Sequence, residues 1–148
     1  MGGIYLRKQT KGYIESLLED YPKYYDYVKQ REYELRHPYI PVDENVGGGK
    51  AQFKKNDVQD RILITIEEDR RLNNLRREHY AIKTCYDEAS SEVRKIVDEL
   101  YFKSPRLRKY HSIYDLCDFK VIKLSRPSAY NYWNKFLQEI ADELGLRY

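Results

Sequence analysis

Apolar residues recur along this chain at the three- and four-residue spacing that places them on one face of a helix. A first helix is predicted from an N-terminal cap at Thr10 to Asp20, with an apolar stripe at Tyr13, Ile14, Leu17 and Leu18. The pair Tyr21-Pro22 interrupts this helix, because the residue before a proline disfavours helical backbone angles. A second helix is predicted from about Pro22 to Arg36, which makes an N-terminal helical pair.

The central part of the sequence predicts one long helix over residues 57–89, beginning at Asn56 or Asp57, which are both good N-caps. Its second half carries a seam of positions spaced alternately by three and four residues, namely Leu72, Leu75, His79, Ile82, Tyr86 and Ala89. Such a seam indicates a helix packed along another helix. Two interpretations remain open: the partner is another helix of the same chain, or it belongs to a second copy in a homodimer.

Serine residues mark two helix starts in the following segment. The pair Ser90-Ser91 is predicted to cap a helix that runs through Phe102, because serine side chains bond to free backbone amides. Ser112 is followed three residues later by Asp115, which is typical of a capping box and predicts a short helix there.

The last helix is predicted to begin after a cap at Ser125, with Pro127 in its first turn, and to end at Gly145. Its core stripe consists of Ala129, Trp133, Phe136, Ile140 and Leu144. The turn between the short helix and this one is expected at Lys123-Leu124, without the glycine that often eases such turns.

The predicted fold class is therefore all-α, in three parts. Residues 1–56 form the helical pair and a glycine-rich loop, residues 57–89 form the long central helix, and residues 90–148 form a C-terminal helix-turn-helix domain.

Charge is distributed unevenly along the chain. Residues 103–135 contain eight of the 27 Lys and Arg residues but only two of the 24 acids, so this stretch carries +6 while the rest carries −3. A basic block in an otherwise mildly acidic protein indicates a polyanionic partner, and double-stranded DNA fits the predicted helix-turn-helix.

The first turns of the last helix supply side chains that can read base edges. Arginine pairs with guanine and asparagine with adenine through two hydrogen bonds each. The predicted base-reading residues are Arg126, Ser128, Tyr130, Asn131, Asn134 and Lys135. The residues predicted to contact the DNA backbone, and so to position without specifying, are Arg106, Arg108, Lys109, Ser112, Lys120 and Lys123.

The string Gly47-Gly48-Gly49-Lys50 invites comparison with a phosphate-binding loop. The comparison fails, because Glu44 stands at the leading glycine position and Ala51 at the Ser/Thr position. A flexible loop is the better interpretation, from which Lys50, Lys54 and Lys55 can still contact a phosphate backbone.

Several other classes of function find no support in the sequence. Cys85 and Cys117 lie far apart, and no histidine stands at zinc-ligand spacing from another ligand, so no metal or cofactor is expected. No arrangement of nucleophile, base and acid stands out, so an enzyme is not expected. No apolar run approaches the roughly 20 residues of a membrane span, and a cytoplasmic protein is expected.

Several strings spread over nearly the whole chain are similar to one protein family. The more specific are Asp43-Glu44-Asn45-Val46-Gly47-Gly48-Gly49-Lys50 and Glu68-Asp69-Arg70-Arg71-Leu72-Asn73-Asn74, with Glu99-Leu100-Tyr101-Phe102 and Ser125-Arg126 beside them. On these strings the chain resembles the RinA-type family of phage late-gene transcriptional activators. The Ser-Arg pair that opens the last helix is also similar to the promoter-reading region of sigma factors. The resemblance implies an activator that binds promoter DNA and contacts host RNA polymerase.

Two alternatives remain beside this interpretation. A small terminase-type subunit that marks phage DNA for packaging would also bind DNA, but it is expected to assemble as a ring. A helical interaction or structural protein without DNA affinity would instead use the apolar seam and the tyrosine-rich N-terminal helices.

Overall fold

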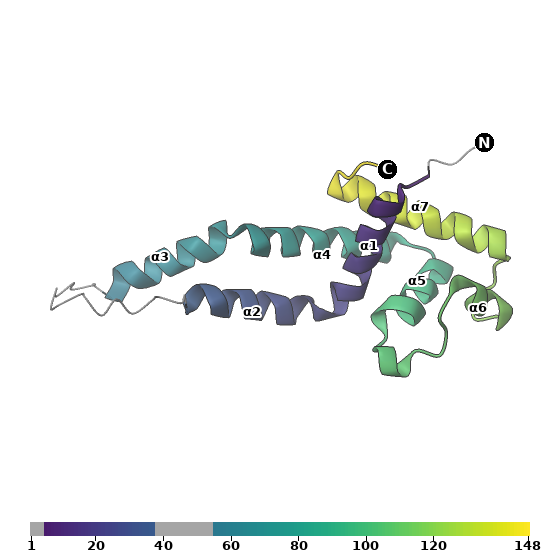
Figure 1. Cartoon of the computed structure of the whole chain (residues 1–148), viewed down its shortest axis with the longest axis horizontal. Coiled ribbons are helices and arrows are strands. Elements are labelled where there is room, and N and C mark those ends of the chain that lie inside the picture. Colours follow the sequence, from purple (N-terminus) through teal and green to yellow (C-terminus); the bar gives the residue numbers. More distant parts are fainter. Residues whose placement is uncertain (1–4, 38–54) are drawn as a thin grey trace. The chain divides into compact units, whose positions relative to one another are not determined.

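The computed structural model describes residues 5–37 and 55–148, and every regular element in these ranges is a helix (Figure 1). The predicted all-α fold class is therefore confirmed. The elements are α1 (Lys8–Asp20), η1 (Tyr21–Lys23), α2 (Tyr24–Arg36), α3 (Lys55–Glu68), α4 (Arg70–Glu88), α5 (Ser91–Val97), η2 (Asp98–Phe102), η3 (Pro105–Leu107), α6 (Ile113–Asp118) and α7 (Arg126–Leu144). The triple-glycine string and Lys54 lie outside the described residues. No helix in the described ranges is long and apolar enough to cross a membrane.

The chain divides into two compact units that do not follow the order of the sequence. Unit 1 comprises Met1–Lys23 and Arg77–Tyr148, and unit 2 comprises Tyr24–Arg76. Helix α4 begins in unit 2 and continues into unit 1. The linear division of the sequence at residues 56 and 89 remains a prediction about domains.

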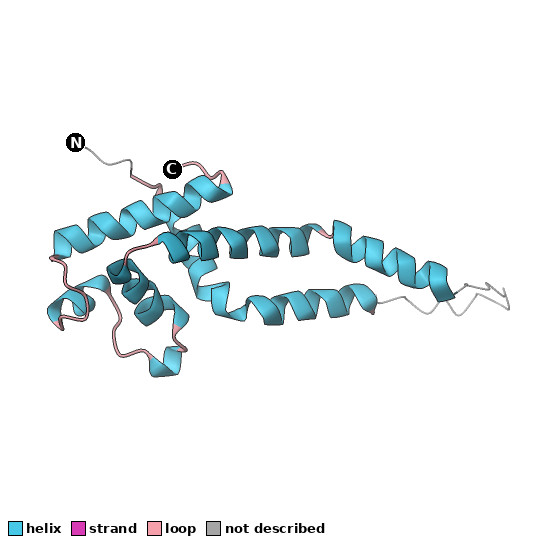
Figure 2. Ribbon diagram, turned by 180° about the vertical axis from the view of Figure 1, so that it is seen from behind, coloured by secondary structure: helices cyan, strands magenta, loops and turns pink. Residues whose placement is uncertain are grey.

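The core of unit 1 lies where α1, α5 and η2 meet α7 (Figure 2). The ring of Trp133, which is 2% exposed, stacks on Tyr101 with 5.5 Å between ring centroids and also contacts Phe136. Ile82, Tyr86 and Ala89 of the predicted seam pack in this same core, so this part of the seam is used within the chain.

Helix α7 forms where its local signals predict it. The Ser125 hydroxyl accepts a hydrogen bond from the backbone amide of Ser128, and Gly145 ends the helix with a left-handed φ of 68°. All five residues of the predicted core stripe are buried (Ala129, Trp133, Phe136, Ile140, Leu144). The predicted caps at Ser90 and Ser112 are confirmed in the same way, by hydrogen bonds from Val93 N and Asp115 N.

The connection between α6 and α7 includes the predicted break at Lys123-Leu124, but it is longer than predicted and begins with a turn directly after α6. Lys120 adopts a left-handed φ of 57°. Its amide donates to the carbonyl of Cys117 at 3.1 Å, and the amide of Val121 donates to that of Leu116 at 2.9 Å. This pair of bonds is a Schellman motif, in which glycine is the usual left-handed residue. A lysine here costs about 1–2 kcal/mol of backbone strain.

The predicted cap at Thr10 is also wrong. Helix α1 starts at Lys8 after Arg7, whose side chain makes no capping bond. Thr10 is instead buried inside the helix, 6% exposed, and its hydroxyl donates to the carbonyl of Arg147 at 2.7 Å. A long-range contact therefore uses the hydroxyl that a local pattern assigns to a cap.

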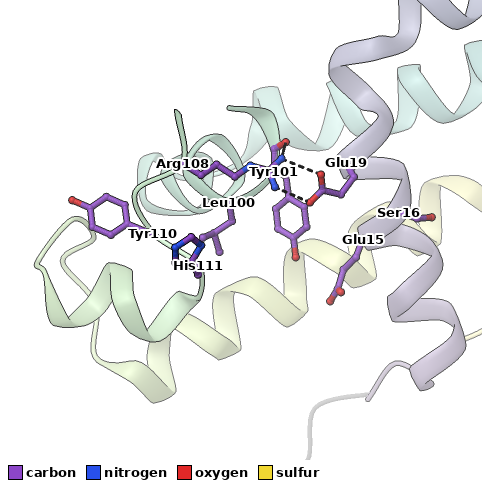
Figure 3. Close-up of a pocket in the computed structure, with 8 residues that line it drawn as sticks. All are labelled: Glu15, Ser16, Glu19, Leu100, Tyr101, Arg108, Tyr110 and His111. Carbon is purple, nitrogen blue, oxygen red and sulfur yellow. Dashed lines mark hydrogen bonds and ion pairs between the residues drawn. The ribbon is translucent and has the colours of Figure 1, made fainter. Parts of the chain in front are cut away.

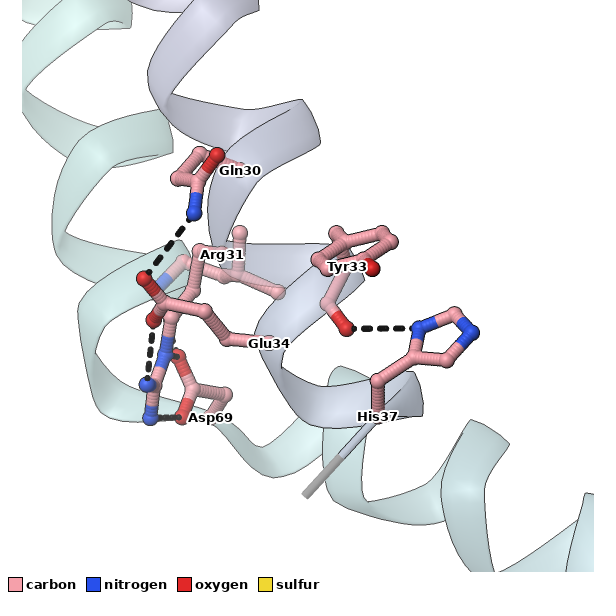
Figure 4. Close-up of polar contacts among 7 residues, drawn as sticks. Gln30, Arg31, Tyr33, Glu34, His37 and Asp69 are labelled. Atoms are coloured by element: carbon pink, nitrogen blue, oxygen red, sulfur yellow. Dashed lines mark hydrogen bonds and ion pairs between the residues drawn. The ribbon is translucent and has the colours of Figure 1, made fainter. Parts of the chain in front are cut away.

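Unit 2 is built on α2 packed against α3. The predicted single helix over 57–89 is wrong, because α3 ends at Glu68 and α4 starts at Arg70. Asp69 makes the break: its Oδ2 accepts from the amide of Leu72 at 3.0 Å, which caps α4. Arg31 of α2 donates to both carboxylate oxygens of Asp69, at 3.1 and 2.8 Å, and to Glu34 at 3.1 Å (Figure 4). The Arg31 guanidinium lowers the pKa of Asp69 from its ordinary value of 3.8 to about 2.

Candidate nucleic-acid interface

The basic C-terminal segment is organised by two capped helices. Helix α6 begins at the Ser112 cap and α7 at the Ser125 cap, and the two helices pack against each other. Ile113 and Leu116 of α6 are buried in the core of unit 1. Because both helices anchor their apolar faces in one core, their polar faces are held in a defined arrangement around the turn at Lys120.

Arg126, the first residue of α7, is held against α6. Its Nε and Nη2 donate to Asp118, with distances of 3.2 and 2.8 Å to Oδ1 and 2.8 Å to Oδ2. The guanidinium also lies 4.7 Å from the centre of the Tyr114 ring, and Tyr114 packs against Tyr130. The hydrogen bonds to Asp118 raise the pKa of Arg126, so the guanidinium stays protonated. Its side chain is 54% exposed and reachable from solvent.

The other predicted base-reading residues differ in exposure. Asn131 and Lys135 are exposed and stand four residues apart, so they form a ridge on one face of α7. Ser128 and Asn134 are half-buried, and the Ser128 hydroxyl accepts from that of Ser125 at 3.0 Å. Of the six predicted residues, Arg126 and Tyr130 therefore lie beside Tyr114 of α6, whereas Asn131 and Lys135 are exposed on α7.

Four of the predicted backbone contacts are exposed around these helices. Arg106 and Lys109 lie in the segment before α6, and Lys120 and Lys123 lie in the turn after it. The turn is braced, because the amide of Lys123 donates to Glu92 of α5 at 2.7 Å. Ser112 differs from these four, since its hydroxyl is engaged in capping α6.

Arg108 is occupied within unit 1. Its guanidinium donates to Glu19 of α1 at 3.2 and 3.0 Å and to the carbonyl of Tyr101 at 2.8 Å (Figure 3). It also donates to the carbonyl of Lys103 at 2.9 Å. The side chain is only 17% exposed. With its donors directed inward, Arg108 is better placed to hold the basic segment onto α1 than to meet a phosphate.

Two exposed aromatic residues lie beside the basic groups, and the sequence pattern did not predict them as part of the site. Tyr114 is 46% exposed under the Arg126 guanidinium, and Phe119 is 70% exposed next to Lys120. The exposure of Tyr114 could have been predicted from the sequence. This residue lies in the first turn after the Ser112 cap, on the side of α6 away from the buried Ile113 and Leu116. Phe119 had no such signal, because it was expected to lie in the helix.

A shallow pocket lies beside Arg108 and is lined by Glu15, Glu19, Tyr101 and His111 among others (Figure 3). Burial raises the pKa of the Tyr101 phenol, and Glu15 and Glu19 raise it further, so this hydroxyl stays protonated. Within the described residues, no group of three or more His, Cys, Asp or Glu side chains could hold a metal ion. The chemistry that this region offers is hydrogen-bond donation and positive charge.

Comparison with known proteins identifies the family. The family model described as "Protein of unknown function (DUF722)" matches residues 11–142. The chain belongs to this family. It is also 26% identical to "Transcriptional activator rinA" of Staphylococcus phage phi11 over 140 residues, which cover 95% of this chain and 94% of that protein. The DUF722 chain is thus RinA-like, as its sequence strings predict. No solved structure matches it.

Proposed function

We propose that this protein is a phage transcriptional activator that binds double-stranded DNA through α7. The observation that carries the proposal is the exposed ridge of Asn131 and Lys135 on the first turns of α7, within a stretch of net charge +6. The RinA-like family supports the activator role, since a relative along nearly the whole chain is a phage transcriptional activator.

In this proposal α6 and α7 act as a helix-turn-helix, with α7 as the recognition helix in the major groove. The amide of Asn131 can pair with adenine N6 and N7, and Lys135 can donate to guanine O6 or N7. Arg126 lies at the N-terminal end of α7, where backbone amides and the helix dipole also favour an anion. It can therefore contact a guanine or the flanking phosphate after leaving Asp118.

The surrounding basic residues would hold the DNA backbone. Arg106, Lys109, Lys120 and Lys123 are exposed on the segments that flank α6, so they can neutralise phosphates on either side of the groove. Arg108 would hold the segment before α6 in place through its ion pair with Glu19 of α1. An activator also has to act on transcription, and we propose host RNA polymerase as its protein partner, in the cytoplasm of the infected bacterium. The proposal includes no catalytic step.

A fluorescence-anisotropy titration of a labelled phage promoter duplex tests the proposal. With about six phosphate contacts, the logarithm of the affinity should fall against the logarithm of the salt concentration with a slope of about −5. Absence of a complex, or a complex insensitive to salt, would mean that the protein does not act through DNA in this way.

Variants separate base reading from backbone contact. Asn131→Ala should relax the preference for one base pair and cost about 1–3 kcal/mol on the preferred sequence only. Lys109→Ala should weaken all sequences about equally and reduce the slope by about one. The control is Lys29→Ala, which removes an exposed lysine from α2. It should change neither the base preference nor the salt slope. If Lys109→Ala changed sequence preference and Asn131→Ala did not, the assignment of the faces would be wrong.

A further inference from the structure

A second basic surface lies on α4, outside the C-terminal segment. Residues 70–83 contain five Lys and Arg residues and one acid, Glu78. Outside this stretch and residues 103–135, the chain holds 14 Lys and Arg residues against 21 Asp and Glu residues. The excess positive charge of the protein is therefore concentrated in two stretches, of which the proposed helix-turn-helix uses one.

The basic residues of α4 form a continuous exposed stripe. On one continuous helix, Arg76 and Arg77 lie four and three residues before Tyr80, and Lys83 lies three residues after it. All four residues are exposed. We call these four residues the α4 stripe. Arg76 and Arg77 form no hydrogen bond or ion pair with another described residue. Tyr80 between them and Lys83 is 67% exposed, so its hydroxyl is free to meet solvent or a partner.

The single acid of this stretch is turned away from the stripe. Glu78 is half-buried, and its Oε1 accepts a hydrogen bond from the Tyr13 hydroxyl of α1 at 2.7 Å. Burial and the bond to Glu78 raise the pKa of Tyr13 to about 12, so the phenol remains a donor. The carboxylate of Glu78 is thus directed to α1. On the exposed side of α4, Lys83 pairs with Asp87 at 2.8 Å, so Arg76 and Arg77 are the two cations of the stripe without an ion pair among the described residues.

We propose that the α4 stripe is a second contact surface for the phosphate backbone of duplex DNA. From Arg76 to Lys83 the helix rises about 10 Å, which is the length of about three base pairs, so the stripe can meet more than one phosphate. Guanidinium groups suit phosphate because they can donate two hydrogen bonds to it at once. The Tyr80 hydroxyl adds a neutral donor to the arginine and lysine donors of the stripe. This inference rests on the proposed DNA-binding function and extends its footprint beyond α6 and α7.

An acidic protein surface is the competing occupant, and the lack of an apolar anchor beside Tyr80 counts against it. Protein interfaces do use arginine and tyrosine, but their cores are depleted of charge and are built around buried apolar and aromatic side chains. Tyr80 is the one large apolar or aromatic residue exposed among the described residues of α4, and no aliphatic side chain beside it could serve as an anchor. Charge and hydrogen-bond donors dominate, as a phosphate backbone requires.

The test compares salt dependence of binding to a labelled mixed-sequence duplex. Arg76→Ala/Arg77→Ala should weaken binding to every sequence and make the salt slope shallower by about two. The matched control is Lys29→Ala/Arg36→Ala on α2, which removes the same charge from a helix with three bases and three acids and should leave the slope unchanged. Arg76→Lys/Arg77→Lys should keep most of the slope, since lysine still neutralises a phosphate.

The outcomes separate the two proposals. If the wild-type protein shows no salt-dependent binding, the proposed function fails before any variant is considered. If the wild-type protein binds but Arg76→Ala/Arg77→Ala has wild-type affinity and slope, the α4 stripe is not a DNA contact, and a loss of transcription activation in that variant would assign it to a protein partner. Circular dichroism checks folding, which exposed Arg→Ala changes within a helix should preserve.

Discussion

The hydroxyl of Thr10 donates a hydrogen bond of 2.7 Å to the carbonyl of Arg147, across a separation of 137 residues in the sequence. This bond joins the first turn of α1 to the segment that follows α7. It lies at the edge of the core of unit 1, where Thr10 is buried while Arg147 is exposed. The start of the chain therefore helps to hold the end of the helix that we propose reads DNA.

Replacing Thr10 with valine should lower the free energy of unfolding by about 1 kcal/mol, because the shape is kept and one hydrogen bond is lost. Thr10→Ser keeps the hydroxyl and serves as the control, with a smaller loss from the missing methyl group. Urea denaturation measures both. A Thr10→Val variant as stable as the wild type, beside a Thr10→Ser variant that is less stable, would assign the role of Thr10 to packing alone.

Lys120→Gly should stabilise the protein and at the same time weaken DNA binding. Glycine relieves the left-handed strain at φ 57°, and we expect a gain of about 0.5–1 kcal/mol after its greater unfolded-state entropy is counted. Loss of the charge should reduce the salt slope of DNA binding by about one. Lys123→Ala removes the same charge without relieving strain, so it should affect binding only. A Lys120→Gly variant less stable than the wild type would contradict the strain argument.

Asp69→Ala should lower the free energy of unfolding by about 1 kcal/mol through loss of the α4 cap, and the amide of Leu72 should exchange hydrogen faster. Asn at this position keeps the cap but loses the charge, so Asp69→Asn isolates the pairing with Arg31. The folded-state pKa of Asp69, about 2, lies below its ordinary value of 3.8. The charge therefore contributes stability above pH 3.8 that is lost as pH falls towards 2. Asp69→Asn should flatten this acid dependence, as measured by denaturation at several pH values.

His79 should make unit 1 less stable in mild acid. Its ring stacks on Tyr21 with 4.6 Å between centroids, and burial together with nearby Lys83 lowers its pKa below 6.5. The unfolded chain then binds a proton at a higher pH than the folded one, so stability is full above pH 6.5 and falls as pH drops below it. His79→Phe keeps a stacking ring without a titrating group. Histidine titrates between about pH 7.5 and 5. Over this interval the melting temperature should fall less for His79→Phe than for the wild type.

Asp118→Asn should raise affinity for duplex DNA, about threefold, because it frees the Arg126 guanidinium and removes a negative charge beside it. A double-mutant cycle separates these causes. In an Arg126→Ala background the gain should shrink, since no guanidinium remains to be freed. Glu139→Gln, late on α7, is the charge-matched control. Weaker binding by Asp118→Asn would show instead that Asp118 has to hold Arg126 in place for DNA.

Local signals in the sequence were sufficient for the helices that carry the candidate site. The caps at Ser90, Ser112 and Ser125 and the left-handed Gly145 form as predicted, because each bond involves backbone only one to four residues away. The apolar period of α7 was equally decisive, since a single face of that helix meets the core. The same reasoning placed Asn131 and Lys135 on the exposed side.

The misplaced features depend on partners distant in the sequence. Asp69 is one of several polar residues in a long helical pattern. Its bond to Leu72 is local, but the residue that pairs with its carboxylate is Arg31, which lies 38 residues earlier. Arg108 and Arg106 look alike in sequence, yet Glu19 and two carbonyls occupy only Arg108. Lys120 gave no sign of a turn, because the residues favoured in left-handed positions are glycine and asparagine.

The sequence by itself therefore determined the all-α class, the starts of α5, α6 and α7, and the location of the basic segment, since these follow from periodicity, short-range hydrogen bonds and charge. Only the tertiary structure decided which basic side chains are available. Arg108 is bound inward, Arg126 is paired across the turn with Asp118, and Arg76 and Arg77 are left exposed on α4. The physical reason is that a charged side chain bonds to an oppositely charged or polar group that lies within about 3 Å of it. Which group lies there is set by the packing of the whole core.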